Sequence, residues 1–198
     1  MNAQSDLPIV VAITGASGAP YAIRLLEQLL AADRPVWLIV TSHGLRLLHT
    51  ELGIGSVDEL RKTVGVDAWR RLVTLYDDAD RGAAPASGSA RNAGMVICPC
   101  SMGTLSAVSV GASRSLVERS ADVMLKERRP LILVPRETPL SAIHLQNMLR
   151  LTRAGAVILP AAPGFYNRPQ TIQELVDFIV ARVLDQLGVE HTLSRRWA

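Results

Sequence analysis

The chain carries several short runs of consecutive apolar, often β-branched residues, and helical patterns separate them. The runs are Ile9–Ile13, Val36–Thr41, Met95–Cys98, Leu131–Val134 and Ala156–Leu159. A strand with one wet face alternates apolar and polar residues, whereas a strand that is apolar throughout is buried on both faces. Such strands separated by helices predict an α/β fold, with a parallel sheet covered by helices on both faces. A length of 198 residues suits one domain spanning residues 1–198.

Helical patterns lie between the apolar runs. In the first of them, Tyr21, Leu25, Leu26 and Leu29 share one face. The longest spans Thr171–Leu187, and Gly188 is placed as its stop. Its apolar stripe consists of Ile172, Leu175, Val176, Ile179, Val183 and Leu187. The polar, Gly/Ala/Ser-rich segment Asp77–Asn92 indicates one long loop, and long loops in compact domains are often functional.

The amino-acid composition indicates the type of core, the class of ligand and the cellular location of the protein. Hydrophobic residues make up 48% of the chain and aromatic ones 4%, so we expect an aliphatic core and surface buried against other subunits. The net charge is +3, and the basic residues, nearly all Arg, are scattered among acids, which favours discrete anion sites over nucleic-acid binding. No apolar run reaches the roughly 20 residues of a membrane span, and MNAQSDLP does not resemble a signal peptide, so we expect a cytoplasmic location. Cys98 and Cys100 are predicted to be reduced structural thiols.

Polar residues follow each of the five predicted strands. They are Gly15-Ala16-Ser17, Thr41-Ser42, Pro99-Cys100-Ser101, Pro135-Arg136-Glu137 and Pro160–Tyr166. In an open parallel sheet these positions share the carboxyl edge, where ligands bind. Gly, Pro and Ser also end strands that bind nothing. Five such loops with usable polar groups favour a ligand site.

The glycine-containing turn after the first strand places backbone N–H groups at a helix N-terminus, where an anion is favoured. Gly15 and Gly18 permit close approach, and Ser17 adds a hydroxyl. The turn matches neither G-x-G-x-x-G nor the P-loop, and the second strand ends in Thr-Ser without the acid that NAD sites prefer. These absences favour a mononucleotide such as FMN, although many turns of this kind bind no ligand.

The other candidates each have a plainer alternative. Ser101 and Thr104 could cap a helix or bind a flavin, and Tyr166 could be a core aromatic or a phosphate donor. Arg119, Lys126, Arg136 and Arg182 are candidate phosphate ligands, but a solvated surface charge is the ordinary role for any one of them. Arg136 stands out, because it directly follows a strand. The four histidines show no metal spacing and are interpreted as structural or exposed.

Five stretches of the chain resemble the UbiX-type flavin prenyltransferases. They are ITGASGAPYAIRLLEQL, VICPCSMGTLSAV, ADVMLKERRPLILVPRETPL, IHLQNMLRLTRAGAVILPAAPGFYNRPQTI and RVLDQLG. The resemblance runs from about Ile9 to Gly188, and LKERRPL and GFYNRP are its specific parts. It implies a flavodoxin-like, Rossmann-like domain that assembles as a homododecamer. Its implied activity joins a dimethylallyl group from dimethylallyl monophosphate to N5 and C6 of reduced FMN, without a metal, and gives prenylated FMN for UbiD-type decarboxylases.

The resemblance also implies roles for residues at matching positions. Flavin-binding positions are Gly15, Ala16, Ser17, Thr41, Ser101, Met102, Gly103, Thr104, Arg119 and Arg136. The positions that bind the phosphate of the prenyl donor are Lys126, Arg136, Tyr166 and Arg182. Glu51 and Glu137 match acids implicated in proton handling. Ser17 is a candidate relay. Arg114-Ser115 and Arg81 depart from the family pattern, which leaves the donor pocket's chain-length preference open.

Two other functions compete with prenyl transfer. A flavin-dependent cysteine decarboxylase of the same superfamily would carry Pro-Ala-Ser-Ala-Asn-Thr where this chain has Pro-Cys-Ser-Met-Gly-Thr. A non-catalytic FMN carrier would need no second phosphate site. An older view of the family as decarboxylases of ubiquinone biosynthesis is explained if its product serves a decarboxylase.

Overall fold

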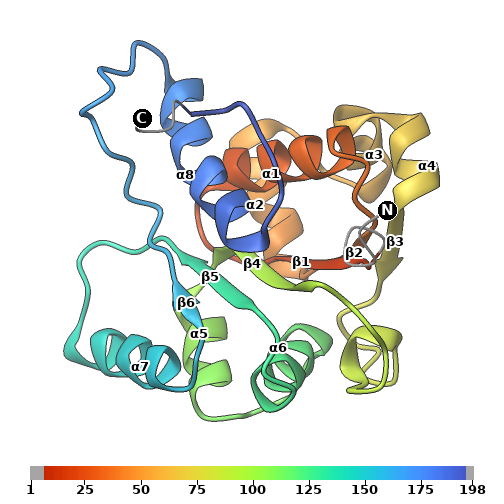
Figure 1. Cartoon of the computed structure of the whole chain (residues 1–198), viewed down its shortest axis with the longest axis vertical. Coiled ribbons are helices and arrows are strands. Elements are labelled where there is room, and N and C mark those ends of the chain that lie inside the picture. Colours follow the sequence, from red (N-terminus) through yellow and green to blue (C-terminus); the bar gives the residue numbers. More distant parts are fainter. Residues whose placement is uncertain (1–6, 195–198) are drawn as a thin grey trace.

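A computed structural model describes residues 7–194, and its centre is one six-stranded sheet (Figure 1). All neighbouring strands are parallel, in the order β3-β2-β1-β4-β5-β6. The strands are β1 (Ile9–Ile13), β2 (Val36–Val40), β3 (Val73–Tyr76), β4 (Gly94–Cys100), β5 (Leu131–Pro135) and β6 (Val157–Ile158). This doubly wound order confirms the predicted α/β fold with a parallel, Rossmann-like sheet.

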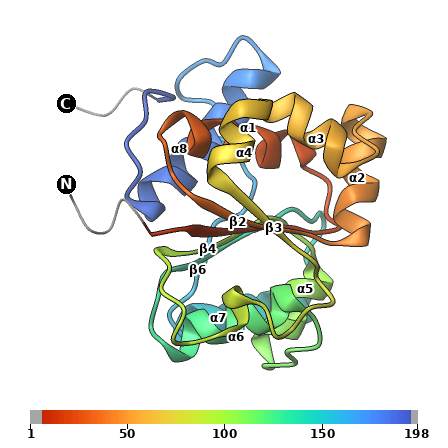
Figure 2. The ribbon, with the colours of Figure 1, turned by 90° about the vertical axis from the view of Figure 1, so that its right-hand side faces the viewer.

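Helices cover both faces of the sheet, as Figure 2 shows edge-on. One face carries α1 (Ala19–Ala31), α2 (Ser42–Leu52), α3 (Val57–Val64), α4 (Val66–Leu72) and α8 (Ile172–Leu187). The other carries the 3₁₀ turn η1 (Ala84–Ala86), α5 (Met102–Ser109), α6 (Leu116–Lys126) and α7 (Ala142–Arg153). Within β1, Ile9, Val11 and Ile13 face the first layer, whereas Val10 and Ala12 face the second. Both faces of β1 are therefore dry, which is why its sequence does not alternate.

Strand β3 was not predicted from the sequence. It lies at the edge of the sheet, and its residues Thr74 and Leu75 are exposed. An edge strand with partly wet faces lacks the continuous apolar run that marked the other five. The predicted strand end at Thr41 was also wrong by one residue, because Thr41 caps α2 instead.

The predicted first and last helices are confirmed. Leu25, Leu26 and Leu29 of α1 are fully buried, and Tyr21 is half-buried beside them. Helix α8 begins after Thr171, whose side chain accepts a hydrogen bond from Glu174 N, and ends at Gly188 with a left-handed φ of 65°. One member of the predicted stripe, Ile172, is exposed, since the first turn of α8 extends beyond the sheet.

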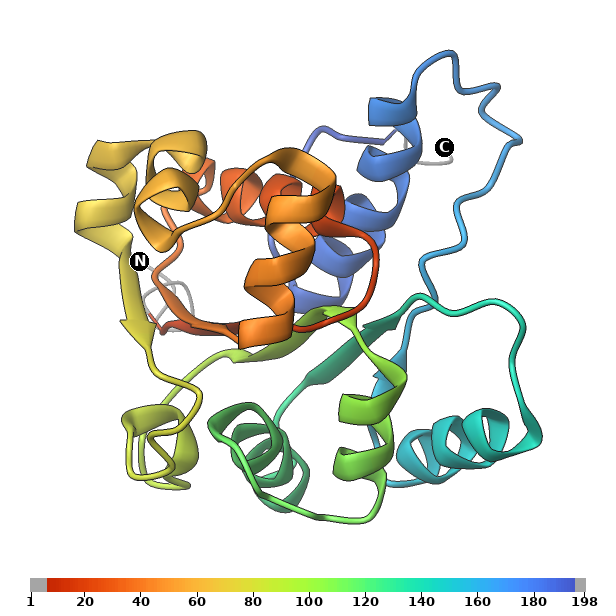
Figure 3. The same cartoon turned by 180° about the vertical axis from the view of Figure 1, so that it is seen from behind.

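Three connections extend from the layers. The Asp77–Asn92 segment is a loop except for η1, and it is anchored where Asp78 accepts a hydrogen bond from Val117 N at 2.9 Å. Seen from behind in Figure 3, the segments before α7 and before α8 extend away from the sheet on the same side of the molecule. Between residues 7 and 194 no helix has both the length and the apolar character needed to cross a membrane.

Candidate active site

The turn after β1 meets a carboxylate from another helix. The Glu51 side chain of α2 accepts hydrogen bonds from Gly18 N at 3.0 Å and from Ala19 N at 2.8 Å. The first turn of α1 is the place where the sequence predicted a bound anion, and the anion found there is the chain's own carboxylate. The structure therefore brings the predicted acid Glu51 to the turn that holds Ser17.

Two glycines allow this turn to pack closely. A Cβ atom at Gly15 would lie 2.5 Å from the Cβ of His43, and one at Gly18 would lie 2.9 Å from the Tyr21 ring. Gly18 also has a φ of 126°, a conformation that side chains rarely adopt. The glycines of the turn are thus required by its geometry, whether or not a ligand binds.

Hydroxyl groups cap the two neighbouring helices of the same edge. Thr41 Oγ1 accepts a hydrogen bond from Gly44 N at 3.0 Å and donates to Ile13 O at 3.3 Å. Ser101 Oγ accepts from Thr104 N at 3.2 Å and lies 2.9 Å from Thr104 Oγ1. The capping role considered for these residues is present, and it holds their hydroxyls in fixed positions at the carboxyl edge. Met102 is buried behind Ser101, while Gly103 is exposed.

Thr14 joins the two turns, and sequence reasoning did not single it out. Its hydroxyl donates to Pro99 O at 2.9 Å and accepts from Ser101 N at 2.8 Å, and the residue is 1% exposed. The ends of β1 and β4 are therefore joined by this buried side chain together with the backbone bond from Thr14 N to Pro99 O at 3.3 Å. The only sequence signal was a hydroxyl residue directly after a buried strand, and nothing in the pattern named its partners, which lie 85 and 87 residues away.

The charged candidates are less enclosed. Arg119 pairs with Asp122 of the same helix at 2.8 Å. Arg136 and Glu137 follow β5 at the carboxyl edge, where both are exposed, and Glu137 Oε1 accepts a hydrogen bond from Thr138 N at 3.1 Å. Arg136 and Glu137 thus lie at the edge that carries the glycine turn.

Lys126 lies at the opposite edge of the sheet. It ends α6, before the chain enters β5, and it pairs with Glu127. Strand β5 runs between Lys126 and Arg136, and its five residues span about 16 Å at about 3.3 Å per residue. The Lys126 ammonium group lies against the Gly88 turn, where an added Cβ would be 2.8 Å from Nζ. Within one chain, the structure does not bring Lys126 to Arg136.

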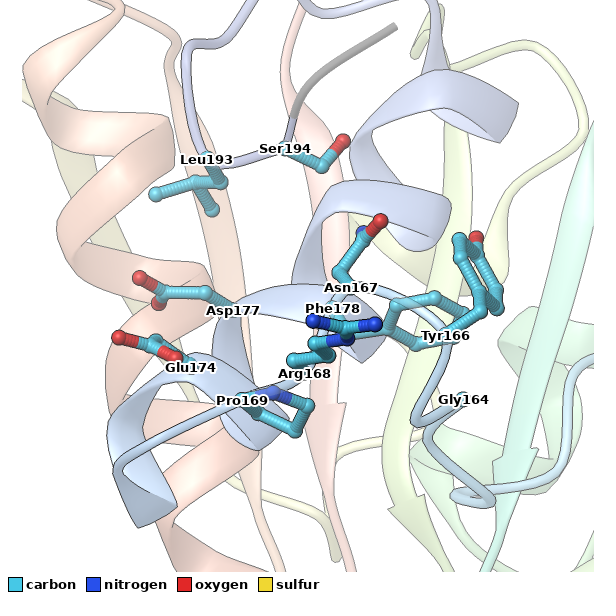
Figure 4. A pocket seen from close by; sticks show the side chains of 10 residues that line it. All are labelled: Gly164, Tyr166, Asn167, Arg168, Pro169, Glu174, Asp177, Phe178, Leu193 and Ser194. Carbon is cyan, nitrogen blue, oxygen red and sulfur yellow. The ribbon is translucent and has the colours of Figure 1, made fainter. Parts of the chain in front are cut away.

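Tyr166 and Arg182 lie on one side of α8. The Tyr166 ring packs edge-on against Phe178, with ring centroids 5.7 Å apart, and Arg182 follows Phe178 by one helical turn. Tyr166 is 61% exposed and lines a cavity of about 530 Å³ with Asn167, Arg168 and other residues of this segment (Figure 4). Both predicted phosphate ligands are thus placed at α8, Tyr166 by packing on Phe178 and Arg182 as part of the helix.

The cysteines are not part of an exposed reactive group. Cys98 and Cys100 are fully buried in β4, and burial raises the pKa of the Cys98 thiol to about 12 and that of Cys100 higher still. A thiol with so high a pKa is a poor nucleophile and a poor metal ligand at neutral pH. No three His, Cys, Asp or Glu side chains within residues 7–194 gather as a metal site would require.

A doubly wound parallel sheet with glycine and hydroxyl turns at its carboxyl edge defines a nucleotide- or flavin-binding α/β protein. Comparison with known proteins narrows this class. The Flavoprotein family matches residues 2–184. The flavin prenyltransferase UbiX of Pseudomonas aeruginosa is 48% identical over 196 residues, which cover 96% of this chain and 93% of the relative. The chain therefore belongs to the Flavoprotein family, and within it to the UbiX-type flavin prenyltransferases.

Two solved structures are similar over nearly their whole length. AnUbiX (PadA1), crystallised in complex with FMN and dimethylallyl pyrophosphate, is 40% identical with a TM-score of 0.89, and 98% of each chain is covered. A dodecameric FMN-dependent UbiX-like decarboxylase from Escherichia coli O157:H7 is 40% identical with a TM-score of 0.88, covering 97% of this chain and 100% of the other. The flavodoxin-like fold predicted from the resemblance is thus confirmed.

Proposed function

We propose that this protein is a flavin prenyltransferase, which joins the dimethylallyl group of dimethylallyl monophosphate to N5 and C6 of reduced FMN. The observation that carries the proposal is the contact between Glu51 and the Ser17 turn at the carboxyl edge. It places a carboxylate beside the turn expected to hold the flavin, in a chain that is 48% identical to a flavin prenyltransferase. The proposal treats residues 1–198 as one flavin-binding domain.

The turns at the carboxyl edge fit a flavin. Backbone groups of Gly15, Ala16 and Ser17 and the hydroxyls of Thr41, Ser101 and Thr104 are already ordered by their own hydrogen bonds and packing, so little reorganisation opposes binding. Met102 and Gly103 complete the second turn, and Arg119 and Arg136 supply positive charge for the FMN phosphate. Reduced FMN, when bound, supplies the nucleophilic N5 and C6 positions.

The residues proposed to transfer protons are the acids at the carboxyl edge, Glu51 and Glu137. Bond formation at C6 requires that C6 lose its proton, so a carboxylate must be close to it. Glu51 is held beside Ser17, which can relay the proton through its hydroxyl. Glu137, exposed and next to the proposed phosphate ligand Arg136, is the second candidate.

The prenyl donor requires a cationic site for its leaving phosphate. Breaking the allylic C–O bond leaves both electrons on the phosphate, and positive groups around it stabilise the charge as it develops. Arg136 and Arg182 supply positive groups and Tyr166 a neutral hydroxyl donor, and Lys126 at the opposite edge belongs to the site only if a second copy contributes it. We therefore infer that the donor-phosphate site forms between protomers of a homo-oligomer.

The exposed surface of α7 supports self-association. Leu145 is 54% exposed, Leu149 50% and Ile143 67%, and Leu140 just before the helix is 41% exposed. So many large apolar side chains within ten residues would be costly in contact with water. A dodecamer, the assembly of the related Escherichia coli protein, would give this surface a partner.

We also propose that the protein is cytoplasmic. Its product, prenylated FMN, would then be used as a cofactor by a UbiD-type decarboxylase.

One experiment separates the candidates. The protein is incubated without oxygen with reduced FMN and dimethylallyl monophosphate, and the flavin is analysed by mass spectrometry. A flavin heavier by one C5H8 unit supports the prenyltransferase, and dimethylallyl pyrophosphate in a parallel reaction tests the donor preference. An unchanged flavin contradicts it and favours an FMN-dependent decarboxylase, the description of the Escherichia coli relative, or an FMN carrier. Adding a UbiD-type apo-decarboxylase then tests whether the product activates it.

A further inference from the structure

The residues after α8 fold back on that helix. Val189 N donates to Leu184 O at 3.0 Å, and Val189 is 4% exposed. Leu193 packs against the same apolar cluster as α1 and α8. The segment Val189–Ser194 is therefore an integral part of this layer, although the resemblance to the prenyltransferases ended at Gly188.

His191 is the buried polar group of this segment. Its side chain is 2% exposed, and its Nε2 lies 3.2 Å from Asp185 Oδ1. Its other ring nitrogen, Nδ1, accepts a hydrogen bond from Leu193 N at 3.3 Å. Because Nδ1 accepts, Nε2 carries the hydrogen and donates a hydrogen bond to Asp185 Oδ1. The sequence had indicated only a structural or exposed histidine here.

Asp185 connects His191 to a predicted substrate ligand. Its second oxygen, Oδ2, accepts a hydrogen bond from Arg182 Nη1 at 3.0 Å. The Arg182 side chain is 56% exposed, and this bond uses one of the five N–H donors of a guanidinium group. The remaining donors can bind a phosphate while the carboxylate holds the group in place.

We propose that His191 is a positioning residue for the prenyl donor, acting through Asp185 on Arg182. This rests on the proposed function, in which Arg182 binds the donor phosphate. A long, exposed arginine loses conformational freedom when it binds a ligand, and a partner that already orients it lowers that cost. A carboxylate anchored on one oxygen by a buried imidazole is a firmer partner than a freely moving surface acid.

The same segment borders the cavity lined by Tyr166, another proposed phosphate ligand, which packs on α8. Leu193 and Ser194 line the cavity that Tyr166 lines from the other side (Figure 4). Phe178, which packs on Tyr166, precedes Arg182 by one turn. The segment Val189–Ser194 thus borders the cavity of Tyr166 and reaches Arg182 through His191 and Asp185.

The test compares two substitutions of His191 in the full-length protein. His191→Leu fills the space without a donor, whereas the amide of His191→Gln can reach Asp185 as Nε2 does. Dissociation constants for dimethylallyl monophosphate and for FMN are measured by calorimetry, alongside kcat/KM for flavin prenylation. We expect about tenfold weaker donor binding and lower kcat/KM in His191→Leu, FMN affinity within twofold, and recovery in His191→Gln. In an Arg182→Ala background, His191→Leu has no further effect, because the two residues act as one unit.

Other results overturn the inference. It fails if His191→Leu binds the donor as tightly as the parent, if His191→Gln does not recover, or if the effects of His191→Leu and Arg182→Ala add. Should His191→Leu not fold, as judged by its thermal transition, His191→Met replaces it. A parent that binds dimethylallyl monophosphate but forms no prenylated flavin contradicts the proposed function, whereas the binding comparison still decides the role of His191. A parent that does not bind the donor contradicts both.

Discussion

The flavin turns and the donor-phosphate ligands differ in how one chain builds them. Around the proposed flavin turns, short hydrogen bonds join segments far apart in sequence: Ser101 N donates to Thr14, and Ala19 N donates to Glu51. The proposed phosphate ligands are exposed, and Lys126 and Arg136 lie at opposite edges of the sheet. The hydrogen bonds of the first region all lie within one chain, whereas the proposed phosphate site would need a second copy to supply Lys126 beside Arg136. Substitutions should therefore separate flavin binding from donor binding.

The largest expected effect comes from breaking the assembly. The double substitution Leu145→Asp and Leu149→Asp places two charges on the exposed apolar surface of α7. We expect smaller species in size-exclusion chromatography and a loss of about 10³-fold or more in kcat/KM, because the cationic site is no longer assembled. FMN affinity should change far less, since the flavin turns remain.

The matched control for that experiment is Gln146→Asp, which adds a charge on the same helix without removing an apolar side chain. It should leave the assembly unchanged. If the α7 double variant keeps the parent's size and activity, α7 is not the contact between copies.

A smaller loss is expected when one phosphate ligand is removed. Lys126→Ala or Arg136→Ala alone should lower kcat/KM about 10²- to 10³-fold, because one positive group no longer stabilises the leaving phosphate. If the site is shared between copies, refolding the two variants together restores about one site in four by random pairing, since each site can take its Lys126 and Arg136 from different chains. Mixing without refolding is the control. No recovery after co-refolding would mean that both residues act within one chain or not in one site.

Removing the proposed proton acceptor tests the flavin region itself. In Glu51→Gln the amide oxygen can still accept from Gly18 N and Ala19 N, but it cannot take a proton. We expect FMN binding within a few-fold of the parent and product formation about 10²-fold slower, measured in single-turnover reactions. Glu190→Gln, an exposed acid beyond α8, is the control. An unchanged rate, or loss of bound flavin, would contradict the catalytic role of Glu51.

The smallest expected effect concerns Thr14. Thr14→Val keeps the shape of the side chain but leaves Ser101 N without its hydroxyl acceptor, while Pro99 O keeps only the bond from Thr14 N. A lost buried hydrogen bond costs about 1–3 kcal/mol, part of it as stability, so we expect about tenfold weaker FMN binding in a fluorescence titration. Thr14→Ser keeps the hydroxyl and should bind FMN nearly as the parent does. Equal affinities for the valine and serine variants would show that the two turns do not depend on Thr14.

Much of the fold could be predicted from the sequence, because the signals were local. Continuous apolar runs such as Ile9–Ile13 indicated dry strands, and the stripe ending at Gly188 indicated α8. Strand β3 was not predicted, because a half-exposed edge strand shows no continuous apolar run. The glycine turn was likewise visible, since Gly18 requires a left-handed backbone that few other residues adopt.

What the chain's own sequence determined is therefore the layered sheet and the position of its polar turns, because strand burial and turn chemistry depend on neighbouring residues. Only the tertiary structure decided that Glu51 occupies the N-terminus of α1, that Thr14 joins two turns and that His191 holds Asp185. It also decided that Lys126 lies far from Arg136. These outcomes depend on which residues meet across the packed layers, and contacts between groups up to 87 residues apart leave no periodic trace in the sequence.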